Sequence, residues 1–111
     1  MGLITDLNTE LNDVYMDDNG AWRQFVIDHL AYIQTNASRV YPDATVMQKY
    51  RYDVKRYMLY NATLASMGWI FLLVNGLSSE RDFTESQIYY LPDYSYIDEL
   101  YHTYITTSQT T

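Results

Sequence analysis

The chain has 111 residues, a net charge of −7 and no cysteine, so a single domain with an apolar core and no disulfides is expected. The absence of cysteine also excludes thiol catalysis and the common zinc ribbons. The negative charge opposes binding to nucleic acid across the whole surface. Tyrosine supplies 13 aromatic residues, against 2 tryptophans and 3 phenylalanines, and tyrosine is typical of protein interfaces.

The first nineteen residues are predicted to form an acidic N-terminal arm outside the core. The arm carries five acidic residues and no base: Asp6, Glu10, Asp13, Asp17 and Asp18. It lacks the basic and apolar segments of a signal peptide. We therefore expect a soluble protein that is not exported by the general secretory route.

Two amphipathic helices are predicted next. The first runs from Trp22 to Ala37 with one apolar stripe. The second covers roughly residues 45–60, after the break "YPDAT", and holds Asp53 at helical contact distance from bases on either side. Its basic cluster is Lys49, Arg51, Lys55 and Arg56. We interpret this cluster as a solvated surface rather than a nucleic-acid site, and the acidic arm of a neighbouring copy would be a more attractive partner.

The most apolar run, "GWIFLLVNG", predicts a third helix over about residues 64–75, buried on most sides and ended by Gly76 in the left-handed conformation. The run is too short to span a bilayer. A polar loop follows, then a short strand "IYYLP" stopped by Pro92. Ser95 with Asp98 predicts the start of a last helix. The domain thus covers residues 20–105, mainly α with a minor strand element, and residues 106–111 are expected to be a flexible tail.

Candidate site residues are few. Asn75 is interpreted as a structural residue that caps its helix and fixes the following chain, and Trp69 as core rather than a sugar platform. His29 lies in an apolar stripe and His102 is isolated, so no metal is expected. The chain also lacks a glycine-rich phosphate loop, a nucleophile elbow and a paired-acid motif, so we expect neither a cofactor nor enzymatic activity.

Residues 50–105 resemble the LysM-like module of baseplate wedge proteins from contractile-tailed bacteriophages. The matching positions are Trp69, Ile70, Leu72, Leu73, Asn75, Leu77, Asp82, Phe83, Leu91 and Pro92. A two-stranded LysM sheet also needs a first strand, and the sequence shows no convincing strand before Tyr52.

The resemblance implies a non-enzymatic structural component of a phage virion, in the tail baseplate wedge or an adjoining tail assembly. Such a protein would occupy the virion tail, and the host cytoplasm during assembly. Its partners would be other tail proteins and further copies of itself, with no membrane. Two alternatives stay open: a LysM-type module that binds peptidoglycan or chitin, and a head–tail connector or adaptor.

Overall fold

The computed structural model describes residues 20–109, and the acidic arm (1–19) and residues 110–111 lie outside the described part. The chain is mainly helical with one small sheet, as predicted. In chain order the elements are α2 (Gly20–Asp28), α3 (Leu30–Thr35), β1 (Ser38–Val40), α4 (Ala44–Tyr50), α5 (Val54–Tyr60), η1 (Ala65–Met67), α6 (Gly68–Val74), η2 (Glu80–Asp82), β2 (Tyr89–Leu91) and α7 (Tyr94–Gln109).

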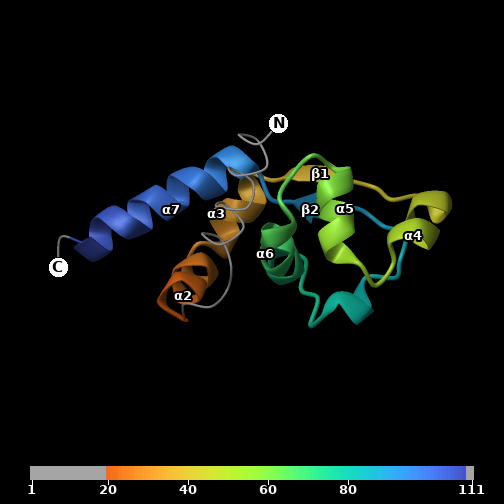
Figure 1. Cartoon of the computed structure of the whole chain (residues 1–111), viewed down its shortest axis with the longest axis horizontal. Coiled ribbons are helices and arrows are strands. Elements are labelled where there is room, and N and C mark those ends of the chain that lie inside the picture. Colours follow the sequence, from red (N-terminus) through yellow and green to blue (C-terminus); the bar gives the residue numbers. More distant parts are fainter. Residues whose placement is uncertain (1–19, 110–111) are drawn as a thin grey trace, which may run out of the picture.

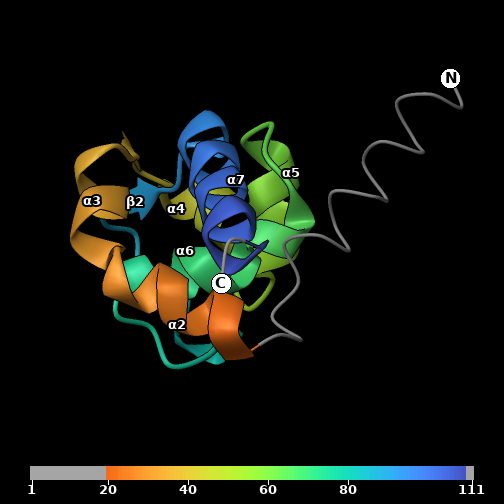
Figure 2. The same ribbon diagram turned by 90° about the vertical axis from the view of Figure 1, so that its left-hand side faces the viewer.

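The helices are arranged along one long axis with α6 near its middle (Figure 1). Helices α2 and α7 lie toward one end, and α4 lies at the other. Viewed along that axis, α7 is in front with α2 below it (Figure 2). None of the helices between residues 20 and 109 is long and apolar enough to cross a membrane.

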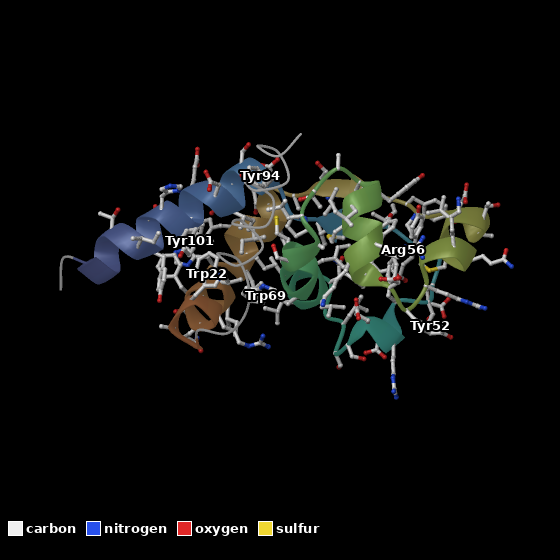
Figure 3. All side chains as sticks on the ribbon, in the orientation of Figure 1. Trp22, Tyr52, Arg56, Trp69, Tyr94 and Tyr101 are labelled. Carbon is white, nitrogen blue, oxygen red and sulfur yellow. The ribbon has the colours of Figure 1, made fainter. Side chains whose placement is uncertain are left out.

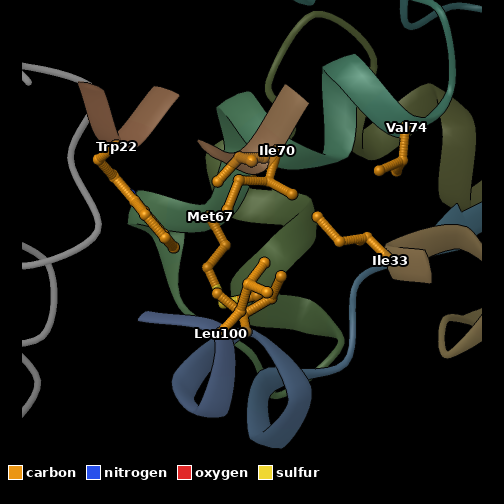
Figure 4. Close-up of a cluster of buried hydrophobic side chains, with 8 residues drawn as sticks. Trp22, Ile33, Met67, Ile70, Val74 and Leu100 are labelled. Atoms are coloured by element: carbon orange, nitrogen blue, oxygen red, sulfur yellow. The ribbon is translucent and has the colours of Figure 1, made fainter. Parts of the chain in front are cut away.

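Two clusters of buried side chains form the core. The first cluster joins α2, α3, α6 and α7 through Trp22, Val26, Ile33, Met67, Ile70, Val74, Ile97 and Leu100 (Figure 4). The second cluster joins α4, α5, α6 and the chain around β2 through Met47, Val54, Tyr57, Met58, Phe71, Phe83 and Tyr89. Helix α6 contributes to both clusters, which makes it the shared element of the core.

The expectation that no strand precedes Tyr52 was wrong. Strand β1 pairs antiparallel with β2, and Arg39 stands opposite Tyr90. A three-residue strand is too short for apolar and polar residues to alternate visibly. The strand therefore exists because of its partner, which lies far along the chain.

The predicted helix from Trp22 to Ala37 is interrupted at His29. The amide of His29 donates to the carbonyl of Val26, at 3.0 Å, rather than to that of Phe25. The His29 ring instead places Nδ1 2.7 Å from the Phe25 oxygen, where the tautomer with a proton on Nδ1 donates. The side chain thus takes the carbonyl that a continuous α-helix would use.

The predicted helix 45–60 is also two helices, because Tyr52 adopts a left-handed φ of 64° between α4 and α5. The predicted helix 64–75 begins with the 3₁₀ turn η1 and ends as expected, with Gly76 at φ 68°.

The last helix starts earlier than predicted. Asp93, and not Ser95, accepts from the amide of Tyr96 at 2.9 Å. Helix α7 continues to Gln109 and so includes residues 106–109 of the expected tail.

Candidate interaction surface

Local capping fixes the corner between α4 and α5. Asp43 accepts from the amide of Val46 at 2.9 Å and starts α4, and Asp53 starts α5 with a longer bond to the amide of Arg56. The Glu80 carboxylate accepts from the amide of Val54 at 3.0 Å. A carboxylate at a helix N-terminus satisfies free amides and opposes the helix dipole. The corner is therefore held by both its own residues and the η2 loop.

An aromatic cluster lines this corner. The rings of Tyr50 and Tyr60 lie 4.9 Å apart, and each lies 6.0 Å from the buried ring of Tyr57. The Arg56 guanidinium lies 5.7 Å from the Tyr50 ring centre and 3.9 Å from the Asp53 carboxylate. Such cation–π contacts hold a long side chain against the surface in one orientation.

The outer face of the corner, which we call the α4–α5 surface, combines exposed apolar and basic side chains. Tyr52, Leu59 and Tyr60 are 54%, 52% and 55% exposed, and Figure 3 shows Tyr52 and Arg56 at this end of the molecule. The surface consists of Lys49, Tyr50, Arg51, Tyr52, Lys55, Arg56, Leu59 and Tyr60. Tyrosine and arginine are the residues that most often dominate binding energy in protein interfaces.

The predicted bases contact different groups on this surface. All four are exposed, but Arg56 lies on Tyr50 while the Arg51 guanidinium lies 5.6 Å from the Tyr52 ring centre. The Lys55 stem runs close to Gly68, and Lys49 lies at the end of α4. The bases are thus distributed across the surface, between its aromatic side chains.

This surface is the positive part of a negative chain. Residues 49–56 carry four bases and one acid, whereas the rest of residues 20–111 carry three bases and eight acids. The local net charge of +3 therefore stands against −5 elsewhere in that part of the chain. Asp53 was predicted to pair with bases on either side of it within one helix. Among the described residues it pairs with Arg56, because Asp53 is the N-cap of α5 and not a residue inside a continuous helix.

Asn75 links α6 to the sheet. Its side-chain Nδ2 donates to the carbonyl of Phe71 at 2.8 Å and to that of Tyr90 at 2.9 Å. Its Oδ1 accepts from the amide of Tyr90 at 2.8 Å. The carboxamide thus pairs with β2 as a third strand would, on the side away from β1. This geometry serves the predicted structural role, with β2 rather than the adjacent loop as the segment that is fixed.

Trp69 is only half-buried, although we expected a core residue. It packs on the first cluster, and the Arg23 guanidinium lies 5.8 Å from its ring centre. The fully buried tryptophan is Trp22, 1% exposed, whose ring meets Tyr101 edge-on at 5.0 Å.

Sequence reasoning missed Leu59 and Tyr60 as members of the surface. The available signal was their spacing, since each follows a base of the same helix by four residues: Leu59 follows Lys55, and Tyr60 follows Arg56.

Burial raises the pKa of the Tyr57 phenol above its ordinary value, and burial likewise raises the pKa of Tyr89. The Tyr89 hydroxyl donates to the Glu85 carbonyl at 2.8 Å. Both phenols belong to the second cluster, where an ionised oxygen would lose its hydration. These shifts reflect core packing and do not indicate a reactive group.

Among residues 20–109, no group of three or more histidine, cysteine, aspartate or glutamate residues could hold a metal ion. The His29 ring is tilted against that of Phe25, with ring centres 4.4 Å apart, and the exposed His102 contacts its own helix at the Asp98 carbonyl. An open hollow of about 580 Å³ lies beside the α4–α5 surface, lined by Tyr52, Ser79, Glu80 and Arg81.

Comparison with known proteins identifies no relative: no protein-family model, curated protein or solved structure matches the chain.

Proposed function

We propose that this protein is a non-enzymatic structural component of a bacteriophage virion, in the tail baseplate wedge or an adjoining tail assembly, and that it acts through protein–protein interfaces. The observation that carries the interface role is the α4–α5 surface. Exposed tyrosine and arginine side chains on a capped corner match the composition of interface hot spots, and the exposed Leu59 adds an apolar contact.

The assignment to a phage tail depends on the resemblance of residues 50–105 to LysM-like baseplate modules. Two of the matching residues, Asn75 and Leu91, belong to segments that meet in space, since Asn75 at the end of α6 bonds the amide and the carbonyl of Tyr90 in β2. The antiparallel pair of β1 and β2 also supplies the two strands that such a module requires. The Asn75 bonds and the strand pair both support the proposal, and neither involves a catalytic group.

The test is incorporation into particles produced with a variant of the α4–α5 surface. Leu59→Ser should greatly reduce the copies found in purified tails by quantitative mass spectrometry, because it removes an apolar contact while leaving the core intact. Ile88→Ser is the matched control, since Ile88 is equally apolar and 66% exposed but lies outside this surface. Normal incorporation of Leu59→Ser, or absence of the wild-type protein from tails, would contradict the proposal. Recovery of the protein at the head–tail junction would favour the connector alternative.

A glycan-binding module is the second candidate, and the hollow beside Tyr52 is the observation that favours it. An aromatic ring next to a carboxylate and a guanidinium offers stacking and hydrogen bonds to a sugar. Titration with chitin and peptidoglycan fragments, followed by NMR, tests this candidate. Shifts at Tyr52 that disappear in Tyr52→Ala would support it over the assembly function.

A further inference from the structure

We propose that the α4–α5 surface binds the acidic arm (residues 1–19) of a second copy of this chain, so that copies associate head to tail. This inference rests on the proposed use of the surface as an interface, and does not depend on the virion assignment. It names the partner of that surface as the chain itself.

Charge complementarity is the first argument. The arm contains five acids and no base, whereas residues 49–56 carry a net charge of +3. The remaining residues from 20 onward carry a net charge of −5. Because like charges repel, binding of the acidic arm to these remaining residues is disfavoured. Binding to the α4–α5 surface is favoured, because that surface has an excess of positive charge.

The apolar groups also match. The arm alternates its acids with Leu3, Leu7, Leu11 and Val14, and the surface presents Tyr52, Leu59 and Tyr60 between its bases. A partner that was merely acidic would leave these three side chains in water. Contact with both kinds of residue would bury the apolar groups and place acids beside the bases at the rim.

The arm and the α4–α5 surface start from different elements of the chain. The arm joins the described chain at Gly20, where α2 begins, and α2 and α4 lie toward opposite ends of the molecule (Figure 1). The arm and the surface are different patches, so one copy can offer both at once, and in the proposed head-to-tail arrangement the interface is heterologous. Heterologous contacts produce rings when the rotation closes and filaments when it does not.

Two full-length variants test the proposal by sedimentation velocity. The arm variant replaces all five acids with amides: Asp6→Asn, Glu10→Gln, Asp13→Asn, Asp17→Asn and Asp18→Asn. The surface variant is Lys49→Gln, Arg51→Gln and Lys55→Gln, and it leaves Arg56 in place because Arg56 pairs with Asp53. The three bases are exposed, and equal urea midpoints would show that folding is intact in both variants.

The wild type should associate with increasing concentration, and added salt should weaken the association because exposed charges are screened. Removing three exposed ion pairs should weaken self-association by about 3- to 150-fold. The decisive sample is an equimolar mixture of the two variants. In a mixed pair the surface variant supplies an unaltered arm and the arm variant supplies an unaltered surface. The mixture should therefore form a 1:1 dimer and no larger species.

Three results would overturn the proposal. The wild type could remain monomeric at every concentration, as expected if each arm contacts its own copy or none. Either variant could associate as strongly as the wild type, or the mixture could contain only monomers. A protein that self-associates in this way but is absent from tails would refute the virion function and leave this inference standing.

Discussion

Replacing Asn75 with alanine tests whether one carboxamide holds the sheet to α6. The substitution removes three hydrogen bonds, one to Phe71 and two to the peptide groups of Tyr90. A hydrogen bond contributes about 0.5–1.5 kcal/mol net, and a buried group left without a partner costs more. We therefore expect Asn75→Ala to lower the free energy of unfolding by about 1.5–4.5 kcal/mol.

Asn61 provides a matched control. It ends α5 as Asn75 ends α6, and its Nδ2 donates to the Tyr57 carbonyl at 2.8 Å, four residues earlier. Both asparagines are half-buried. The long-range pair of bonds to Tyr90 distinguishes Asn75, so Asn75→Ala should cost about 1–3 kcal/mol more than Asn61→Ala.

Urea denaturation of the wild type and both variants measures the difference, provided that the denaturant dependence of unfolding stays unchanged. Amide hydrogen exchange gives a second measurement. The Tyr90 amide should exchange faster in Asn75→Ala and not in Asn61→Ala, because its acceptor is the Asn75 oxygen. Equal costs for the two variants, or an unchanged Tyr90 exchange rate, would refute the reasoning.

Two further predictions concern the core. Trp22→Ala should lower the free energy of unfolding by about 3–5 kcal/mol, the usual cost of emptying a large buried site. Trp69→Ala should lower it clearly less, because Trp69 is half-buried. Equal losses in urea denaturation would contradict this prediction. Burial raises the pKa of Tyr57, Tyr89 and Tyr96, so their contribution to stability is complete below the unfolded pKa of about 10 and is lost as the pH rises through the folded pKa. Tyr57→Phe should therefore show a shallower alkaline loss of stability than the wild type, and an identical loss would contradict the assignment.

The sequence predicted the elements whose signals are local. The apolar run indicated helix α6, and Gly76 indicated its end because φ of 68° favours glycine. Strand β2 was predicted from β-rich residues before a proline. The helical stripe beginning at Trp22 correctly identified a buried face, since Trp22, Val26 and Ile33 all lie in the first cluster.

The same stripe concealed the break at His29, because apolar periodicity continues on both sides of it. Asp53 caused a similar error: an acid four residues from one base and three from another fits a helix interior as well as an N-cap. In the structure the left-handed backbone of Tyr52 separates the two helices, and Asp53 is the N-cap of the second one. Strand β1 and the bond from Asn75 to Tyr90 could not be predicted, since both depend on segments that meet only in the folded chain.

The candidate surface was likewise predicted only in part. Its four bases were visible as a cluster in the sequence, and their exposure agrees with a surface position. The tyrosines between the bases were visible too, but the ring that each arginine contacts was not, because those contacts depend on the turn at Tyr52 and on the approach of α5 to the end of α4. Arg56 lies on Tyr50, a contact across two helices, and a single continuous helix would not have produced it.

Helix α6 explains why its segment has no polar face. Ile70 and Val74 pack in the first cluster, while Phe71 packs in the second. Of the half-buried residues, Trp69 and Leu73 lie against the first cluster and Leu72 lies against the second. A helix at the edge of one core keeps one side in water and shows an apolar stripe, whereas α6 is covered from two directions. Its all-round apolar character thus reflects a helix that two groups of helices share, and the carboxamide of Asn75 fixes the sheet at the end of that helix.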